Sequence, residues 1–264
     1  MQIWDTMQKV VRNWVVICFI TSQGICVAQS FSIKPHMSYT TVQMNDVNSR
    51  NQARVEYLKE ITGETVPQPD PFEGNFAWGI QIGYHLENNY FLTFATYYFT
   101  ENHKLYYQDE SQGYPVIFDN LQSIKLFDIS FGIKYFFRYS SWKRFNFYIA
   151  GVVGFAIGWS EITFRYFDEI NSVNNKGDFS SNALTGQLMT GLSIRFSPAI
   201  SLEPEIGYRA ANLSQMDGKR IISQNFPNMP DGQLERIDNQ YQTEAIYDFS
   251  GFFANIGLQF MFNL

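Results

Sequence analysis

The chain has 264 residues, a formal net charge of −6 at pH 7, 17% charged residues and 17% aromatic residues. Soluble domains contain roughly 25% charged residues, so this chain is poor in charge. Disordered chains are rich in charge and poor in aromatics, and nucleic-acid-binding domains are usually basic. The composition therefore argues against both classes and predicts no nucleic-acid partner; the length suits one or two domains.

Residues 1–28 have the pattern of a cleaved signal peptide. Two basic residues precede an apolar run, and a small-residue cleavage site stands before Gln29. The run is too short to span a bilayer as a helix, although an uncleaved anchor or a buried helix is the alternative. Because Cys18 and Cys26 both lie in this segment, we expect the exported chain, residues 29–264, to have no disulfide and no thiol-ligated metal.

Beyond Gln29, apolar residues recur at every second position in eight segments, which predicts β-strands. No run of about 20 apolar residues suited to a transmembrane helix follows Gln29. The predicted strands are residues 31–42, 75–86, 90–100, 123–138, 145–160, 183–196, 201–213 and 247–264.

The connections between these strands alternate in length. Short turns fall at residues 87–89, 139–144 and 197–200, and long connections fall at residues 43–74, 101–122, 161–182 and 214–246. An even strand number with short turns on one side is typical of bacterial outer-membrane barrels. We therefore predict an all-β fold: an eight-stranded antiparallel transmembrane up-and-down β-barrel with short periplasmic turns and four long extracellular loops.

A soluble lipocalin-like barrel or a β-sandwich is the alternative fold. The non-apolar face of the predicted strands is mostly Gly, Ala, Ser, Asn and Gln, which suits the filled interior of a small barrel. A water-facing exterior would carry more Lys and Glu. The last segment alternates apolar residues up to Leu264, as the C-terminal signal of such barrels does, so we expect insertion by the barrel assembly machinery.

The first long connection contains a predicted helix. Ser49–Gln52 resembles a capping box, Val55, Leu58 and Ile61 follow at helical spacing, and Gly63 provides a stop. We expect a short surface helix that either covers the barrel or docks a partner. Long connections are unusual unless they are functional or disordered, so this is the positive indication of a binding role.

Aromatic residues gather near the predicted strand ends. Trp142 lies at a short turn, and Trp78 and Trp159 lie near the long-connection ends of their strands. Amphipathic rings form belts at the two faces of a bilayer. We therefore predict that these three tryptophans mark the membrane interfaces.

Ile124–Phe137 (IKLFDISFGIKYFF), Phe147–Gly158 (FYIAGVVGFAIG), Leu202–Leu213 (LEPEIGYRAANL) and Gly257–Phe262 (GLQFMF) carry a family resemblance. With them, residues 75–264 resemble the small outer-membrane barrel domain common in Bacteroidota, the group that includes PorT-like proteins. The architecture also resembles OmpA-type and OmpX-type barrels. The resemblance implies a bacterial outer-membrane location but no particular function, because such barrels host many roles.

Seven charged residues fall on the polar face of the predicted strands. If this face lines the lumen, the charges share a narrow space and must pair. We predict a salt-bridge network in which Glu203 and Glu205 pair with Arg195 and Arg209; the alternative is a gated ion path in which one pair exchanges partners. An eight-stranded barrel leaves almost no free bore, so a constitutive pore is not expected. The seven are Lys34, Asp128, Lys134, Arg195, Glu203, Glu205 and Arg209.

No catalytic, cofactor-binding or metal-binding motif is present in the sequence, so we predict no enzyme activity and no cofactor. His103, close in sequence to Asp109, Glu110 and Ser111, keeps a rim-located hydrolase as a minor alternative. The oxygen-rich residues between positions 168 and 178 allow calcium, but a solvated polar loop is the preferred interpretation.

The long connections, counted over residues 43–74, 101–122, 161–182 and 214–248, contain 20 acidic and 9 basic residues. We interpret them as a soluble surface, with contact to lipopolysaccharide through divalent ions, or to a basic partner, as the sharper alternative. The sequence thus predicts a non-enzymatic outer-membrane barrel that contacts lipid, lipopolysaccharide and other outer-membrane proteins. Its role is that of an accessory or interaction subunit or of a structural protein, and a small channel or transport-linked barrel is the alternative.

Overall fold

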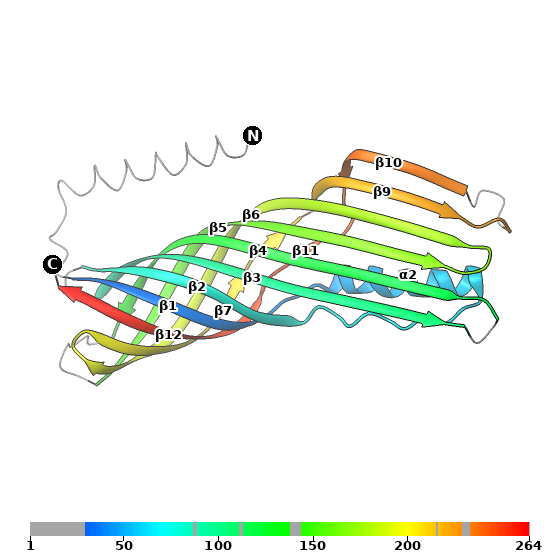
Figure 1. The fold of residues 1–264 in the computed structure, drawn as a ribbon. Helices are drawn as coiled ribbons and strands as arrows, with labels where there is room; N and C mark the ends of the chain where they lie inside the picture. Colours follow the sequence, from blue (N-terminus) through cyan, green and yellow to red (C-terminus); the bar gives the residue numbers. More distant parts are fainter. Residues whose placement is uncertain are drawn as a thin grey trace.

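The computed structural model describes residues 30–86, 89–110, 113–137, 144–214, 216–228 and 233–263. The predicted signal peptide, residues 1–28, lies outside the described residues. Eight antiparallel strands form a closed ring (Figure 1). They are β1 (Ser30–Thr41), β2 (Gly74–His85), β3 (Tyr90–Asp109), β4 (Val116–Phe136), β5 (Phe145–Phe167), β6 (Ser172–Ser197), β7 (Ile200–Ala210) and β12 (Gly251–Asn263).

Sequence neighbours pair along the ring from β1 to β7, and β12 closes it by pairing with both β7 and β1. Closure leaves no free strand edge within the barrel. The predicted eight-stranded up-and-down antiparallel barrel is therefore confirmed. Among the described helices, none is long and apolar enough to cross a membrane.

Two predicted long loops are wrong, because β3 to β6 continue through residues 101–122 and 161–182. The pairing of β3 with β4 runs unbroken to Asp109 and Val116, and the pairing of β5 with β6 runs to Phe167 and Ser172. These strands are 20–26 residues long, whereas β1, β2, β7 and β12 have only 11–13. The longer strands consequently leave the barrel together as an open sheet (Figure 1).

The last predicted loop, residues 214–246, also contains strands. Here β9 (Asp217–Asn225) and β10 (Gln233–Gln242) form an antiparallel pair, and β9 pairs with the far part of β6. We call the far parts of β3 to β6 together with β9 and β10 the projecting sheet. Beyond the barrel its order is β10-β9-β6-β5-β4-β3, with β10 at one edge.

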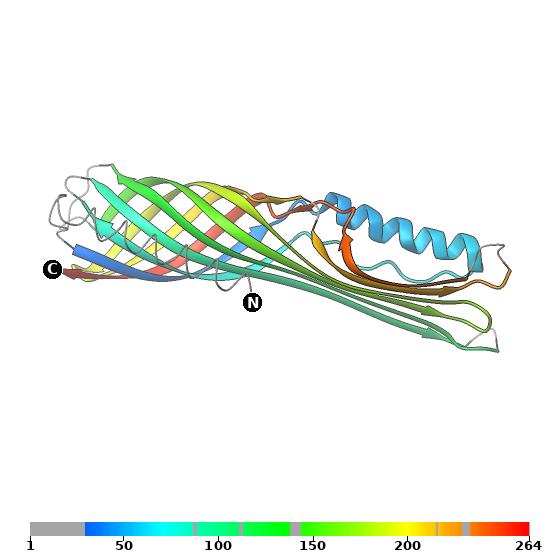
Figure 2. The same ribbon diagram turned by 90° about the horizontal axis from the view of Figure 1, so that it is seen from above.

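The helix α2 (Asn45–Thr62) lies along one face of the projecting sheet (Figure 2). Its buried side chains Val55 and Leu58 belong to an apolar cluster that includes Phe118 and Phe164 of the sheet. Gly63 ends the helix with φ 78°, a conformation that glycine adopts at little cost. The predicted capping box with Ser49 as N-cap is wrong: Met44 is the N-cap, five residues earlier, and the helix begins at Asn45 because hydrogen bonds and apolar contacts outside the helix hold its first turn.

A layer of apolar side chains closes the end of the barrel from which the projecting sheet leaves. It includes the start of α2 and the short paired strands β8 (Asn212–Leu213) and β11 (Tyr247–Asp248). We call it the cap cluster; its fully buried members include Met44, Phe72, Phe99, Leu126, Leu213, Met216, Tyr247 and Phe249. The lumen is therefore covered on this side by packed hydrocarbon.

The outer wall of the barrel is apolar. Val153, Leu184, Leu188 and Phe252 are between 69% and 84% exposed. A water-exposed wall of this kind would be a large apolar patch, which soluble monomers rarely show. Trp78 and Trp159 are exposed on the same surface, and Trp159 pairs with Ser180, where the pairing with β9 begins. Trp142 lies outside the described residues.

Substitutions at two glycines test which face of the strands lines the lumen and which forms the outer wall. A Cβ added to Gly257 would meet Lys34 Cγ at 2.7 Å inside the barrel, whereas one added to Gly151 would meet nothing within 4 Å. We expect Gly257→Val to destabilise the fold by about 1–3 kcal/mol through overpacking and Gly151→Val to be neutral. Urea unfolding in detergent micelles measures both; equal midpoints for the two variants would contradict the assigned faces.

Candidate functional site

Four buried charges meet in the barrel lumen. Lys34 comes from β1, Lys134 from β4, and Glu203 and Glu205 from β7, and none is more than 3% exposed. The two glutamates stand two residues apart, so the alternation of a strand places both on the inner face. We call these four residues the charge cluster.

Each lysine contacts both glutamates. Lys34 Nζ lies 2.6 Å from Glu205 Oε1 and 3.4 Å from Glu203 Oε2. Lys134 Nζ lies 2.7 Å from Glu203 Oε2 and 3.5 Å from Glu205 Oε1. Two positive and two negative charges balance, which lets the group remain ionised away from water.

Polar neighbours complete the charge cluster. Tyr148 donates to Glu205 Oε1 at 2.7 Å, and Asn255 donates to the other oxygen of Glu205. Lys134 Nζ lies 4.1 Å from the centre of the Tyr148 ring. With its nitrogen turned toward Glu203, Gln259 donates to Oε2 at 3.2 Å and accepts from Ser32 at 3.0 Å. These residues were not predicted from the sequence, although Tyr148 lies between Phe147 and Ile149, which both face outward.

The predicted pairing of the glutamates with Arg195 and Arg209 is wrong. Arg209 instead donates to the Phe249 carbonyl at 3.1 Å and stacks 4.3 Å from the centre of the Tyr97 ring, below the cap cluster. Arg195 donates toward Met261 Sδ at 3.5 Å, near the short-turn end. Strand register sets these heights along the barrel, and the lysines stand level with the glutamates.

Asp128 occupies another level of the lumen. It is fully buried and accepts a hydrogen bond from Thr185 Oγ1 at 2.6 Å. The structure therefore places all seven predicted residues inside the barrel but brings only Lys34, Lys134, Glu203 and Glu205 into one ion-paired group.

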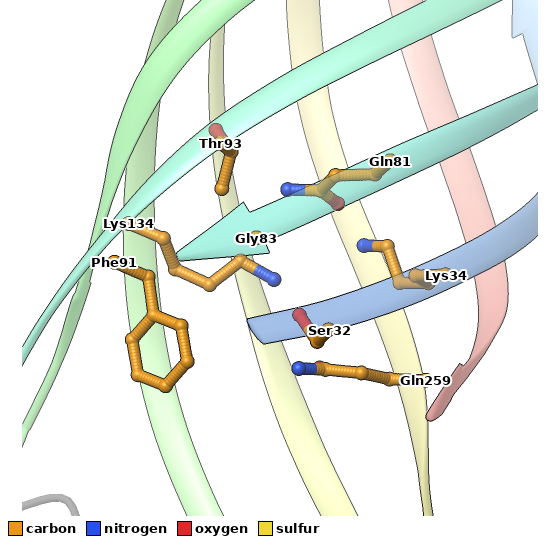
Figure 3. Close-up of a pocket in the computed structure, with 8 residues that line it drawn as sticks. All are labelled: Ser32, Lys34, Gln81, Gly83, Phe91, Thr93, Lys134 and Gln259. Carbon is orange, nitrogen blue, oxygen red and sulfur yellow. The ribbon is translucent and has the colours of Figure 1, made fainter. Parts of the chain in front are cut away.

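Small cavities lie on both sides of the charge cluster. The smaller, about 10 Å³, contains the amines of Lys34 and Lys134, which point toward each other from different strands (Figure 3). The larger, about 40 Å³, has room for roughly three water molecules. Among the polar atoms that line it, His36 Nδ1, Tyr97 OH and Asn255 Oδ1 are buried and have no hydrogen-bond partner among the described residues. The lumen is thus a largely filled, polar interior with small spaces of molecular size.

His103 and Asp109, two of the candidate hydrolase residues, lie far apart. His103 lies on β3 with Nε2 2.9 Å from Glu101 Oε1, and its ring packs against Phe72. Asp109 is six residues further along the same strand, which is about 20 Å. Ser111 lies outside the described residues. The loop position predicted for His103 is wrong, because β3 extends through it.

Asp168 organises the tip of the β5–β6 hairpin. Its carboxylate accepts hydrogen bonds from the backbone N–H groups of Ile170 and Asn171, at 2.9 and 2.6 Å, and from Tyr166 OH at 2.7 Å. These contacts occupy the oxygens that would bind calcium. Within the described ranges, no group of three or more His, Cys, Asp or Glu side chains could hold a metal ion.

The stability of this tip should depend on pH. Burial by itself raises the pKa of Asp168, but hydrogen bonds from Asn171 and Tyr166 outweigh it and lower the pKa below its usual value. The ionised group therefore stabilises the tip above about pH 4, the unfolded pKa, and the stabilisation is lost as pH falls through the lower folded pKa. We expect the protection of the Ile170 and Asn171 amides against hydrogen exchange to fall in that range in the wild type but not in Asp168→Asn. Identical pH profiles would contradict this.

Comparison with known proteins finds partial and distant similarity. The model of the autotransporter beta-domain family matches residues 135–219, about a third of the chain. No curated protein matches.

Several solved structures are similar in fold. Ail, the attachment invasion locus protein of Yersinia pestis, is 10% identical with a TM-score of 0.39, covering 89% of this chain and 99% of its own. OprG from Pseudomonas aeruginosa is 12% identical with a TM-score of 0.43, covering 90% and 98%. A major outer membrane protein from Thermus thermophilus is 11% identical with a TM-score of 0.42, covering 88% and 99%.

Likeness at these TM-scores carries no argument about what this protein does. The predicted resemblance to Bacteroidota PorT-like domains stays a prediction.

Proposed function

We propose that this chain is an integral protein of the bacterial outer membrane, inserted by the barrel assembly machinery. The observation that carries the proposal is the direction of the side chains. Charged and polar groups fill the inside of the closed ring, whereas the outside is a continuous apolar wall. In water this arrangement would expose the apolar wall, whereas in lipid the wall is covered and the lumen charges stay inside the closed ring.

We further propose a non-enzymatic role as an accessory or interaction subunit, or as a structural membrane protein. Two features support this role. The charge cluster and the cap cluster fill the barrel, so its interior offers little space to a substrate. The projecting sheet and α2, in contrast, present a large ordered surface beyond the barrel (Figure 2). An interaction role places the working surface there, and its partners would be lipopolysaccharide or other outer-membrane proteins.

Purification of the tagged full chain from native outer membranes in mild detergent tests the interaction role. We expect a complex heavier than the monomer, with one co-purifying protein in fixed stoichiometry. A matched variant should lose that partner while keeping a folded barrel: Ile237→Arg changes an exposed side chain of β10 at the edge of the projecting sheet. A clean monomer from native membranes would contradict the subunit role and leave the structural one.

A small channel is the second candidate, and the polar cavities beside the charge cluster favour it. Conduction would require Lys34 and Lys134 to exchange partners and the cap cluster to open. In planar bilayers a channel predicts a conductance that changes in Glu205→Gln. If the wild type shows no conductance, the channel function is ruled out. If the wild type conducts steadily, the conclusion that the lumen is filled is wrong.

A further inference from the structure

Two arginines face each other between α2 and the projecting sheet. Arg54 of α2 lies over Phe164 of β5, and Arg220 of β9 donates to Asn175 of β6. Phe164 and Asn175 stand opposite each other in the pairing of β5 with β6, so the two guanidinium groups lie over neighbouring positions of one face. In keeping with this, burial and the like charge of Arg220 lower the pKa of the Arg54 guanidinium to about 10. Arg54 therefore remains cationic at neutral pH.

Each guanidinium is held on an aromatic ring. Arg54 lies 4.8 Å from the centre of the Phe164 ring, and Arg220 lies 4.8 Å from the centre of the Tyr241 ring. Arg220 also donates to Asn175 Oδ1 at 3.2 Å and to Tyr241 OH. Stacking fixes the plane of a guanidinium while its N–H groups remain directed outward along that plane.

The arginine pair lacks a counter-charge. Nη1 of Arg54 is buried and has no hydrogen-bond partner in the part of the chain that the structure describes. Within the same residues, no carboxylate lies within 4.0 Å of Arg54 or Arg220. The neighbouring basic residues differ: Arg50 pairs with Glu244 at 3.1 Å, and Arg236 pairs with Asp238 at 2.7 Å.

Asp238 is an acidic residue paired with Arg220 in the sheet. It stands opposite Arg220 in the strand register, but its Oδ1 is turned to Arg236 and its Oδ2 is buried without a partner. Within the described part of the chain, the buried Nη1 donor of Arg54 has no acceptor, and two stacked cations without a carboxylate repel each other. This arrangement is unfavourable unless an anion binds between them.

We propose that Arg54 and Arg220 together bind an oxyanion, a phosphate or sulfate group carried by a soluble or glycan ligand. Two guanidinium groups match the tetrahedral oxygens of such a group through charge-assisted hydrogen bonds. Arg54 stands nine residues after Asn45, about 14 Å along the helix from its barrel end. The site therefore lies along the projecting sheet, which the proposed function, on which this inference rests, puts outside the bilayer, so the ligand reaches it from there.

Binding of inorganic phosphate and sulfate to the purified full chain tests the site. Isothermal titration at constant ionic strength, with chloride as the reference anion, should give saturable binding to the wild type. Arg54→Gln and Arg220→Gln should each weaken that binding by about tenfold or more, since each removes a charged donor. Arg50→Gln is the matched control on the same helix and should bind as the wild type does.

Two further readouts separate the source of the anion and the effect of Asp238. Intact and dephosphorylated lipopolysaccharide are titrated in the same way: Arg54-dependent binding of the intact form alone identifies a glycan-borne phosphate, and Arg54-dependent binding of inorganic phosphate identifies a free one. Asp238→Asn should tighten binding several-fold because it removes a negative charge opposite Arg220. Neither anion nor lipopolysaccharide binding the wild type, or equal binding to Arg54→Gln, would overturn the proposal, and so would weaker binding to Asp238→Asn.

Thermal unfolding guards against misfolded variants. Without the anion, Arg54→Gln should be at least as stable as the wild type, because it removes repulsion between like charges. Added phosphate should raise the unfolding temperature of the wild type and of Arg50→Gln but not that of Arg54→Gln. An equal rise of the unfolding temperature in the wild type and both variants would contradict a site at Arg54.

Discussion

Replacing Glu205 by alanine is expected to destabilise the barrel by about 3–5 kcal/mol, the cost of leaving a buried charge uncompensated. The carboxylate of Glu205 accepts from Lys34, Tyr148 and Asn255, so its removal leaves three donors facing a small void. Urea unfolding in detergent micelles, followed by tryptophan fluorescence and by the gel shift of the folded barrel, measures the loss.

The pairing itself is measured by a double-mutant cycle. Lys34→Met alone should also be severely destabilising, because Glu205 then lies beside one lysine instead of two. The double variant Lys34→Met with Glu205→Leu removes one charge of each sign and should recover much of the loss. Arg50→Gln, an exposed ion pair on α2, is the control and should change stability by less than about 1 kcal/mol. Additive losses in the cycle would mean that the charge cluster is not a coupled unit.

Leu188→Arg should have the second large effect. Leu188 is 70% exposed on the outer wall of the barrel and pairs with Gly151 of β5. An arginine facing lipid at the middle of the bilayer costs about 2–4 kcal/mol, so we expect slow insertion and lower stability in lipid vesicles.

The matched control for this variant is Ile237→Arg. Ile237 is equally apolar and 66% exposed, but it lies on β10 in the projecting sheet. Outside the bilayer an arginine there meets water and should leave folding unchanged. A similar penalty at both positions, or none at Leu188, would mean that the apolar wall does not contact lipid.

The barrel could be predicted from the sequence because apolar and small or polar residues alternate along each strand that has one apolar face. In β5, Phe147, Ile149, Gly151 and Val153 occupy the outer face, and the parity of these positions also assigns Tyr148 to the lumen. The same parity placed Lys34, Glu203 and Glu205 inside. Parity has a period of two, so it distinguishes the faces of a strand but does not give height along the barrel.

Height depends on register, which was not predicted. Gly257 pairs with both His36 and Glu203, and this stagger through β12 brings Lys34 level with Glu205. Arg195 and Arg209 have the same parity but stand at other levels. The strand pairing of the closed ring was therefore needed to see that lysines, and not arginines, pair with the glutamates.

The projecting sheet was missed because its apolar residues are diluted. Leu105 and Tyr107 alternate with Lys104 and Tyr106, but only one side meets α2, and polar residues occupy the other. The β9–β10 pair has an even weaker alternation of apolar and polar residues. The far sheet is stabilised by α2 across a long sequence separation, which local patterns do not report.

The start of α2 was misplaced for the same reason. Asn48 exchanges hydrogen bonds with the backbone of Phe72 at 2.9 and 3.0 Å, and Asp46 accepts from the backbone N–H of Ile246 at 2.7 Å. These partners hold the first turn without a side-chain cap at Met44. A capping box at Ser49 was the local signal, and tertiary contacts extended the helix past it.

Labelling of single cysteines in intact cells tests most directly the claim that the apolar wall lies in the outer membrane and the projecting sheet faces the outside. Leu188→Cys and Ile237→Cys are treated with a membrane-impermeant maleimide before and after disruption of the outer membrane. We predict rapid labelling of Ile237→Cys in intact cells and protection of Leu188→Cys in both conditions until the protein is unfolded. Ready labelling of Leu188→Cys, or labelling of Ile237→Cys only after disruption, would contradict this account.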